Sequence, residues 1–280
     1  MNFKFSRQKP FGVLIEPKDK DNDKNIKNLD ISSLRDLFKS EHLLILRGFD
    51  AFKNSEDFSS YCERWGRVSL WPFGKVLELK EQDEPKDHIF DNSYIPMHWD
   101  GMYRPEVPEY QFFYCVKAPL EGQGGRTTFS NTALVLNNIS KETKMEWEKV
   151  IGTYHRKMEF YDSKTVSPLV TKHPHRDYQV IRYNEAHSIE KGDFINPPHI
   201  TFKGIFNQNI EEFQSSVDQA LYNPKNFYAH EWKSGDIVIA DNHTLLHGRE
   251  NFTSSSSRHL QRVQVESSPS HKNPGLESFK

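Results

Sequence analysis

The chain has 280 residues, a formal net charge of −2 and nearly balanced numbers of basic (37) and acidic (39) residues. This balance gives no indication of a basic surface for nucleic acid. No apolar run is long enough to cross a membrane, and the N-terminus lacks the apolar stretch of a signal peptide. Because two cysteines, Cys62 and Cys115, cannot form a disulfide framework, we expect a cytoplasmic protein with no nucleic-acid or membrane partner.

The predicted elements of the first half alternate between strands and helices. Apolar runs predict strands at 11–16 and 43–48, on either side of a charged loop at 18–28 and a helix at 31–41. A second helix is expected at 57–65, where Gly66 ends it, and an aromatic strand at 110–116.

Strands dominate the rest of the chain. A helical pattern over 133–154, broken near Ser140, precedes a strand at 177–183 and a helix at 210–221, and further strands are expected at 235–241 and 258–266. The polar residues 267–280 are expected to form a loose tail. The sequence therefore predicts one mainly β domain over 1–280, with its core at 11–266. An antiparallel barrel or jelly roll with flanking and inserted helices is favoured over a parallel α/β sheet.

The most informative motif is His98-Trp99-Asp100, considered together with His247 far downstream. Side chains two apart on a strand share a face, so His98 and Asp100 can both point inward. His247 follows the strand predicted at 235–241. Two imidazoles and one carboxylate are the ligand set of a non-haem iron(II) oxygenase, in which three positions stay open for a cosubstrate and O2.

Other histidines offer rival metal pairs, since the chain has 13 of them. His173 and His175 form one pair. His243 and His247 form another with the i, i+4 spacing of a zinc-enzyme helix, but the glutamate of that motif is missing and the preceding residues are strand-like. We therefore rank the set of His98, Asp100 and His247 first and expect His243 to pack or hydrogen-bond near the cavity rim.

With these motifs, the chain resembles the taurine dioxygenase/TfdA family of Fe(II)- and 2-oxoglutarate-dependent oxygenases. The resemblance rests on segments 46–49, 98–100, 124–129 and 241–247 and on the arginines that follow. Within the family, the run 98–101 with Pro108-Glu109 and 125–129 looks most like the PvcB-type enzymes, which act on isonitrile derivatives of tyrosine made by a partner isonitrile synthase. The resemblance implies a double-stranded β-helix core and iron ligation by His98, Asp100 and His247.

Two arginines are candidates for binding the cosubstrate. Arg258 lies 11 residues after His247 (258 − 247) and Arg262 lies 15 after it (262 − 247), and both offsets match the family's arginines. An arginine fork fits a carboxylate bidentately, so we assign Arg258 to the distal carboxylate of 2-oxoglutarate and Arg262 to its other carboxylate or an anionic substrate. By resemblance, the Thr127 hydroxyl also reaches the cosubstrate. In the alternative interpretation, both arginines form a solvated sheet edge.

Aromatic residues near the metal motif are candidates for a substrate pocket, although aromatics on strands are more often core residues. Tyr103, directly after the motif, is the one we select for substrate binding. The others are Tyr94, Trp99, Phe112 and Tyr114.

These observations predict an enzyme that hydroxylates or desaturates a small anionic substrate with Fe(II), 2-oxoglutarate and O2. The resemblance points to a tyrosine-derived isonitrile in natural-product biosynthesis, with an isonitrile synthase as pathway partner. Two alternatives stay open: a hydroxylase of taurine, an aryloxyalkanoate or an amino acid, and a metal-binding barrel without turnover. A homo-oligomer is compatible with the sequence.

Overall fold

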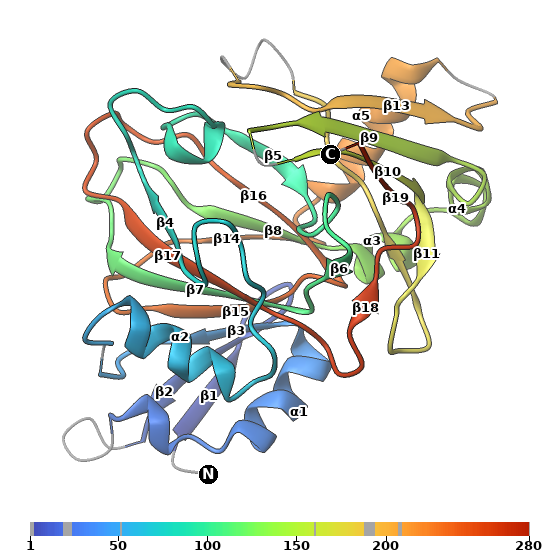
Figure 1. Ribbon diagram of the computed structural model, residues 1–280. Helices are drawn as coiled ribbons and strands as arrows, with labels where there is room; N and C mark the ends of the chain where they lie inside the picture. The colour runs from blue at the N-terminus through green and yellow to red at the C-terminus, as the bar shows by residue number, and fades with distance from the viewer. Residues whose placement is uncertain are drawn as a thin grey trace.

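Two facing sheets form the core of the computed structural model, which describes residues 3–18, 24–50, 52–159, 161–187, 194–206 and 209–279 (Figure 1). The major sheet has the strand order β1-β2-β3-β15-β7-β17-β4, and the minor sheet has the order β14-β8-β16-β5. The mainly β jelly-roll prediction is confirmed. Residues 19–23 of the predicted charged loop lie outside the described residues.

All neighbouring strands of the major sheet are antiparallel except β2 and β3. Its strands are β1 (Phe3–Arg7), β2 (Val13–Pro17), β3 (Leu43–Leu46), β4 (Leu77–Lys80), β7 (Tyr110–Lys117), β15 (Ile237–Asp241) and β17 (His259–Val265). The minor sheet consists of β5 (Ile95–His98), β8 (Thr127–Asn131), β14 (Phe227–His230) and β16 (Leu245–Arg249).

Strand alternation explains how the major sheet is covered on both faces. On β15, Val238 and Ala240 belong to the apolar cluster that includes Phe129 and Leu245 of the minor sheet, and so fill the space between the sheets. Their neighbour Ile239 belongs to a second cluster on the outer face. Neighbouring side chains on a strand point to opposite faces, so an apolar run such as 237–240 is buried on both sides.

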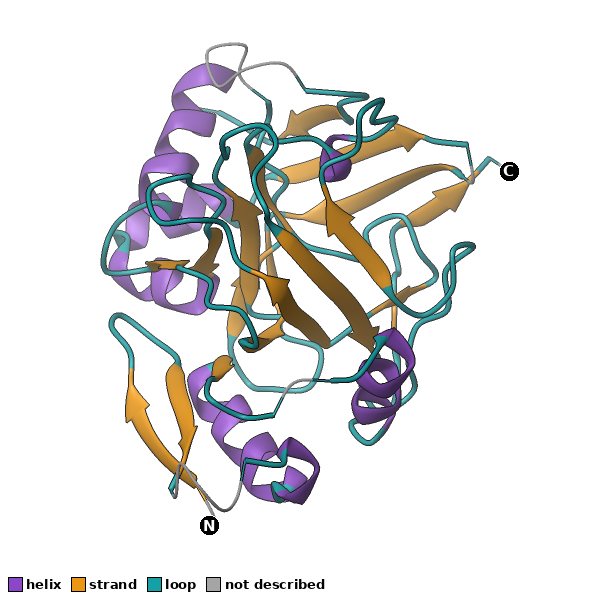
Figure 2. Cartoon of the chain, turned by 90° about the vertical axis from the view of Figure 1, so that its left-hand side faces the viewer, coloured by secondary structure: helices purple, strands orange, loops and turns teal. Residues whose placement is uncertain are grey.

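Helices α1 (Ile31–Glu41) and α2 (Ser55–Glu63) cover the outer face of the major sheet (Figures 1 and 2). Asp30 caps α1 by accepting from the backbone N–H groups of Ser32 and Ser33, which satisfies two of the helix's free donors. Leu34 and Phe38 are fully buried one turn apart, as their helical spacing predicts.

A third sheet, in the order β13-β9-β10-β19, packs beside the minor sheet with the remaining α-helices. Its strands are β9 (Ile151–Lys157), β10 (Asp162–Pro168), β13 (His199–Lys203) and β19 (Leu276–Ser278), and the helices are α3 (Thr132–Asn138), α4 (Lys141–Trp147) and α5 (Ile210–Leu221). The smaller elements are η1 (Ile26–Asn28), η2 (His88–Phe90), β6 (Glu106–Val107), β11 (Val170–Lys172), β12 (Gln179–Ile181) and β18 (His271–Lys272).

Two local predictions are wrong. The helix expected over 133–154 ends at Trp147, and residues 151–157 form β9, because this segment pairs with β10 on one side and β13 on the other. The tail from 267 is not loose: β18 pairs with β6, and β19 pairs with β10. Both errors come from strand pairing with other segments of the chain, which overrides local preference.

Candidate metal centre and cavity

The short turn after β5 positions the predicted metal motif. His98 ends the strand, and Asp100 follows just before Gly101, whose φ of +91° is left-handed. A Cβ atom on Gly101 would lie 2.7 Å from Pro108 Cδ, so only glycine fits this turn without a shift. The Asp100 backbone is clamped by Asn242: its N–H donates to Asn242 Oδ1 (2.8 Å), and its carbonyl accepts from Asn242 Nδ2 (2.9 Å).

His247 of β16 is the direct cross-strand neighbour of His98 on β5, with ring centroids 4.3 Å apart. Asp100 faces both rings: Oδ1 lies 3.7 Å from His98 Nε2, and Oδ2 lies 3.8 Å from His247 Nε2. One ligand atom from each of the three side chains lies within 4.8 Å of the others. The structure thus brings together the three residues that the sequence selected from two distant segments.

The protonation states fit a divalent metal ion. Burial lowers the pKa of His98 and lowers that of His247 to about 3, so both imidazoles are neutral and have a free lone pair at neutral pH. His98 Nδ1 lies 2.8 Å from the Pro96 carbonyl, and a hydrogen bond donated there leaves Nε2 free to bind a metal. Burial opposes ionisation of Asp100, but Arg262 and the two histidines outweigh it and hold its pKa well below the usual range. Two neutral imidazoles and a carboxylate suit iron(II).

Arg262 and Gln264 of β17 both contact the Asp100 carboxylate. Arg262 Nη1 and Gln264 Nε2 each donate to Asp100 Oδ2 over 2.7 Å. Residues 262 and 264 share a face of the strand, which explains why both reach the same oxygen. Neither is a solvated edge residue, so the alternative interpretation of the arginines is wrong for Arg262.

Arg258 is a buried cation without an anionic partner. It is 4% exposed, its Nε donates to the Gly125 carbonyl (2.9 Å), and no carboxylate lies within 4.0 Å of it in the part of the chain that the structure describes. Burial and the nearby Arg249 lower its pKa to about 9, so it remains charged at neutral pH. An unpaired buried charge is costly, and the carboxylate of a bound dianion would relieve that cost.

Thr127 lies on β8 beside β16 and is 4% exposed. Its hydroxyl oxygen accepts a hydrogen bond from Trp232 Nε1 (3.0 Å). Among the described residues, neither Thr127 nor Arg258 lines the cavity of about 1000 Å³ that opens beside His98 and Asp100. These two predicted cosubstrate residues are therefore buried and are not part of the cavity wall.

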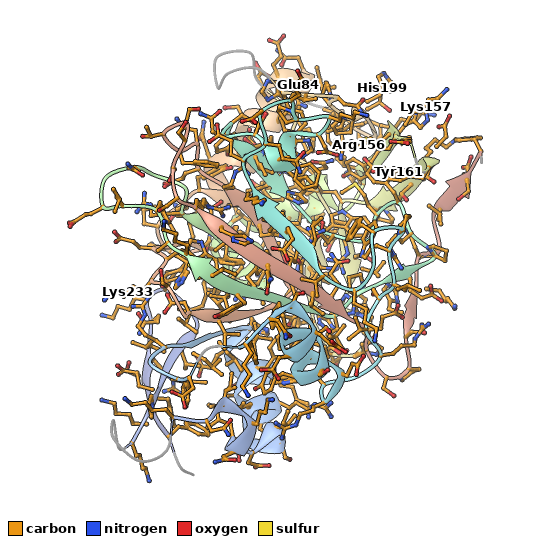
Figure 3. The ribbon with its side chains drawn as sticks, turned by 60° about the vertical axis from the view of Figure 1, so that its left-hand side comes forward. Glu84, Arg156, Lys157, Tyr161, His199 and Lys233 are labelled. Carbon is orange, nitrogen blue, oxygen red and sulfur yellow. The ribbon has the colours of Figure 1, made fainter. Side chains whose placement is uncertain are left out.

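A cavity of about 1000 Å³ opens beside the metal motif and is lined by His98, Asp100 and Arg262. Tyr103 lines it as predicted, and its ring stacks on Tyr161 with centroids 5.5 Å apart. Figure 3 shows Tyr161 close to Arg156, which comes from β9. The other aromatic residues of the wall are Trp71, Phe73, Phe90, Trp99 and Phe194.

Some sequence candidates lie elsewhere. Phe112 and Tyr114 belong to the outer core cluster, and Tyr94 bonds with Glu185. Conversely, Trp71, Arg104 and Arg156 line the cavity although the sequence did not single them out. Of these three, only Arg104 could have been selected from the sequence as a cavity residue, because it directly follows Tyr103.

The rival histidines form a separate cluster, in which His173 and His243 are buried and His175 is exposed. His243 lies in the turn between β15 and β16, with its ring 5.6 Å from that of His173 and 5.7 Å from that of His175. In the described chain, the convergent group of potential metal ligands comprises His98, Asp100 and His247. His243 packs as expected, but not among the residues that line the cavity, so its placement near the rim is wrong.

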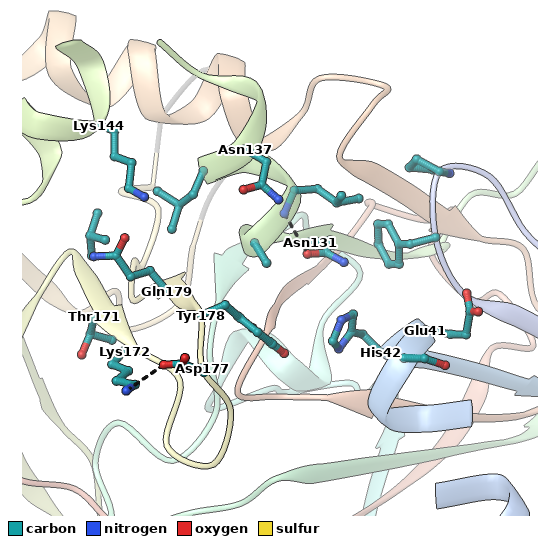
Figure 4. A pocket seen from close by; sticks show the side chains of 17 residues that line it. Glu41, His42, Asn131, Asn137, Lys144, Thr171, Lys172, Asp177, Tyr178 and Gln179 are labelled. Carbon is teal, nitrogen blue, oxygen red and sulfur yellow. Dashed lines mark hydrogen bonds and ion pairs between the residues drawn. The ribbon is translucent and has the colours of Figure 1, made fainter. Parts of the chain in front are cut away.

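A second hollow of about 1020 Å³ lies between α1, α3 and the β11–β12 hairpin. His42, directly after α1, and Tyr178, directly before β12, both line this hollow, and Lys172 pairs with Asp177 at its edge (Figure 4). None of the three convergent ligands lines it, so it is not the reaction cavity.

The jelly roll brings together two neutral histidines and one carboxylate, and it buries an arginine that has no carboxylate partner among the described residues. These features define the class of 2-oxoglutarate-dependent non-haem iron oxygenases. Residues 7–264 match the model of the taurine catabolism dioxygenase TauD, TfdA family. The chain belongs to this family and is an Fe(II)- and 2-oxoglutarate-dependent oxygenase that acts on a small molecule.

Similar proteins narrow the comparison. The chain is 44% identical over 270 residues, 96% of its length and 92% of the other's, to a tyrosine isonitrile desaturase of Pseudomonas aeruginosa. The crystal structure of PvcB from the same organism superposes with a TM-score of 0.84 at 40% identity, covering 99% of this chain and 96% of that one. A second PvcB structure, described as an Fe, alpha-ketoglutarate dependent oxygenase from an isonitrile synthetic pathway, gives a TM-score of 0.82 at 40% identity, with coverage of 99% and 96%.

None of the described helices combines the length and apolarity that a bilayer crossing requires.

Proposed function

We propose that this enzyme desaturates the isonitrile derivative of tyrosine, forming a carbon–carbon double bond in the side chain. The observation that carries this proposal is the 44% identity with a tyrosine isonitrile desaturase over 96% of the chain. The cavity supports it: the stacked pair Tyr103 and Tyr161 gives an aromatic substrate ring a matching wall, next to the residues that would hold the iron.

His98, Asp100 and His247 would hold the iron, which with 2-oxoglutarate and O2 supplies the oxidising power for removing hydrogen from the substrate. The protein's own contribution is position and charge. The Pro96 carbonyl lies within hydrogen-bond distance of His98 Nδ1 and so fixes the orientation of the ring. Arg262 and Gln264 both donate to one oxygen of Asp100. Arg262 also lines the cavity, where it would hold the second carboxylate of the cosubstrate or the substrate.

The charge of the site explains the role proposed for Arg258. Iron(II) and one carboxylate have a net charge of about +1, and bound 2-oxoglutarate, a dianion, would make the site negative. Arg258 would neutralise the distal carboxylate, with the Thr127 hydroxyl beside it. Water is excluded from this end because Arg258 is 4% exposed and packed against Phe252, whose ring lies 5.6 Å from the guanidinium carbon.

Three wider assignments accompany the proposal. An isonitrile synthase would supply the substrate, since the reaction class requires a preformed isonitrile. Residues 11–266 would form one oxygenase domain, with the tail attached through β18 and β19. The enzyme would work in a reducing compartment such as the cytoplasm, because Cys62 and Cys115 are both free and buried.

Substrate-dependent succinate formation tests the function. The purified protein is loaded with iron(II) and 2-oxoglutarate and offered tyrosine isonitrile, tryptophan isonitrile, free tyrosine, taurine and an aryloxyalkanoate. We expect the tyrosine isonitrile to give the highest kcat/KM and an alkene product, identified by mass and NMR. Preferred turnover of taurine or an aryloxyalkanoate, or an alcohol as the sole product, would overturn the proposal.

Ligand substitutions test the assigned iron site. His98→Ala, Asp100→Ala and His247→Ala should each abolish the visible charge-transfer absorption that forms anaerobically with iron(II) and 2-oxoglutarate. The matched control is His199→Ala, because His199 is exposed on β13. Full absorption in any ligand variant would remove that residue from the site.

A further inference from the structure

An aromatic turn at 70–74 borders the cavity. It is closed by two backbone hydrogen bonds, from Trp71 N–H to the Gly74 carbonyl (3.1 Å) and from Gly74 N–H to the Trp71 carbonyl (2.9 Å). Within it, the Trp71 and Phe73 rings stack with centroids 5.6 Å apart and planes 11° apart. Leu70 is 67% exposed and Phe73 is 47% exposed, so the turn is an apolar rim at the boundary between cavity and solvent.

Arg104, from a separate segment of the chain, packs against the Trp71 ring of this turn. Its guanidinium carbon is 4.1 Å from the centre of the Trp71 ring, and Nη2 donates to the Leu70 carbonyl (3.1 Å). Its Nε atom is buried and has no hydrogen-bond partner among the described residues. A cation over a tryptophan face is held in place by the ring without being neutralised, so the positive charge of Arg104 stays available.

The three arginines of the cavity wall differ in how their charge is balanced. Arg262 donates to Asp100 (2.7 Å), and Arg156 pairs with Asp87 (3.3 Å). Arg104 has no carboxylate within 4.0 Å in the described part of the chain. An anionic group that enters the cavity would therefore gain most from Arg104, because the other two would have to share or release an existing partner.

Arg104 is also tied to the metal motif by short connections. Its backbone N–H donates to the Gly101 carbonyl (3.1 Å), which fixes it one turn beyond Asp100. The Trp71 side chain is tied to the same motif, because Trp71 Nε1 donates to Gln264 Oε1 (3.0 Å) and Gln264 Nε2 donates to Asp100 Oδ2 (2.7 Å). Arg104, its tryptophan support and the proposed iron ligand thus form one rigid unit, so a group bound by Arg104 is held at a set place relative to the iron.

We propose that Arg104, supported by Trp71, binds the carboxylate of the substrate and so aims its side-chain carbon–carbon bond at the iron. This assignment rests on the proposed function, in which the substrate is an isonitrile that retains the amino-acid carboxylate. The planar arginine fork would hold both carboxylate oxygens. The Tyr103 and Tyr161 stack would hold the substrate ring, and the two contacts together would fix the bond to be oxidised.

The test compares tyrosine isonitrile with its decarboxylated counterpart, 4-(2-isocyanoethyl)phenol, on wild type, Arg104→Met and Arg104→Lys. Wild type should prefer the carboxylate by about 10- to 100-fold in kcat/KM, the range expected for a charged hydrogen-bonded pair. Arg104→Met should lose this preference mainly through KM, and Arg104→Lys should retain part of it. Calorimetric binding of both compounds to the metal-free protein should show the same order, and the KM for 2-oxoglutarate should stay unchanged.

Arg156→Met is the matched comparison, because Arg156 is a cavity arginine that already has a carboxylate partner, Asp87, and, unlike Arg262, this partner is not a proposed iron ligand. If Arg156→Met abolishes the preference for the carboxylate and Arg104→Met keeps it, the assignment to Arg104 is overturned. Failure of wild type to turn over any isonitrile would instead overturn the proposed function, so the two outcomes are distinguishable. Melting temperatures of all variants are measured, and Arg104→Lys decides the matter if Arg104→Met does not fold.

Discussion

Asn242 and Asp100 lie 142 residues apart in sequence, yet two hydrogen bonds join them: the Asp100 N–H reaches Asn242 Oδ1 over 2.8 Å, and the Asn242 amide reaches the Asp100 carbonyl over 2.9 Å. The same amide group donates to the Pro108 carbonyl (2.8 Å), and its oxygen accepts from Gln111. Asn242 is 1% exposed. One buried side chain therefore holds the backbone of the proposed iron ligand.

Asn242→Ala should weaken iron binding by about 10- to 100-fold, the usual effect of removing a group that orients a metal ligand. It should also lower the free energy of unfolding, since the Asp100 N–H and the Pro108 carbonyl lose their partner. Iron titration under anaerobic conditions measures the first effect and chemical denaturation the second. Asn137→Ala, at an exposed position of α3, is the control and should match wild type in both. Unchanged iron affinity in Asn242→Ala would contradict the role assigned to the clamp.

Gly101→Ala should destabilise the fold and displace Asp100. The new methyl group would be 2.7 Å from Pro108 Cδ and 3.0 Å from Val107 Cα, and the φ of +91° already disfavours a side chain. Gly122→Ala is a matched control, because Gly122 has a φ of +79° but nothing within 4 Å of the added atom. We expect a cost of about 1 kcal/mol at Gly122 and a clearly larger one at Gly101. Equal melting temperatures of the two variants would show that the Pro108 contact is easily relieved.

Arg258→Met should have opposite effects on stability and on cosubstrate use. Removing a buried charge without a carboxylate partner should raise the melting temperature of the protein alone. The KM for 2-oxoglutarate should rise by about 10- to 100-fold, because the distal carboxylate loses its charged partner. The control is Arg126→Met, at a half-exposed arginine paired with Glu250. An unchanged KM for 2-oxoglutarate would instead assign the binding of the distal carboxylate to Arg262.

Glu109 should make stability fall as the pH rises. Burial, reinforced by the Asp241 carboxylate and opposed by Arg176 and Arg35, raises the pKa of Glu109 from 4.5 to about 7, and Tyr110 faces the same carboxyl group. Below pH 4.5 the carboxyl group is protonated in both states and has no effect. Between pH 4.5 and 7 the unfolded chain loses the proton first, so unfolding becomes easier by an amount on the order of 1–3 kcal/mol.

The free energy of unfolding of Glu109→Gln, compared with that of wild type, should therefore be higher at pH 8 than at pH 4. Denaturation curves at both values measure the difference, with Glu121→Gln at an exposed position as control. A gain of the same size at both pH values would contradict the raised pKa.

Prediction from sequence worked best where the pattern is local. The helices at 31–41 and 210–221 were predicted to the residue, because apolar spacing and an asparagine or aspartate cap define them. Residues 151–154 were assigned to a helix although they belong to β9, because their strand character depends on β10 and β13. In the site, the pair His98 and Asp100 was predicted from the His-x-Asp motif considered with His247, although Asp100 lies in the turn after β5 and not on the strand.

The sequence by itself determined the metal motif, the two later arginines and the elements that carry them. Only the tertiary structure decided which charges have partners: Arg262 meets Asp100 across 162 positions, whereas Arg258 and Arg104 meet no carboxylate in the described chain. The physical reason is the distance along the sequence over which each effect acts. Backbone preference and side-chain alternation act between near neighbours, but burial and charge pairing depend on strands that become neighbours only when the sheets pack.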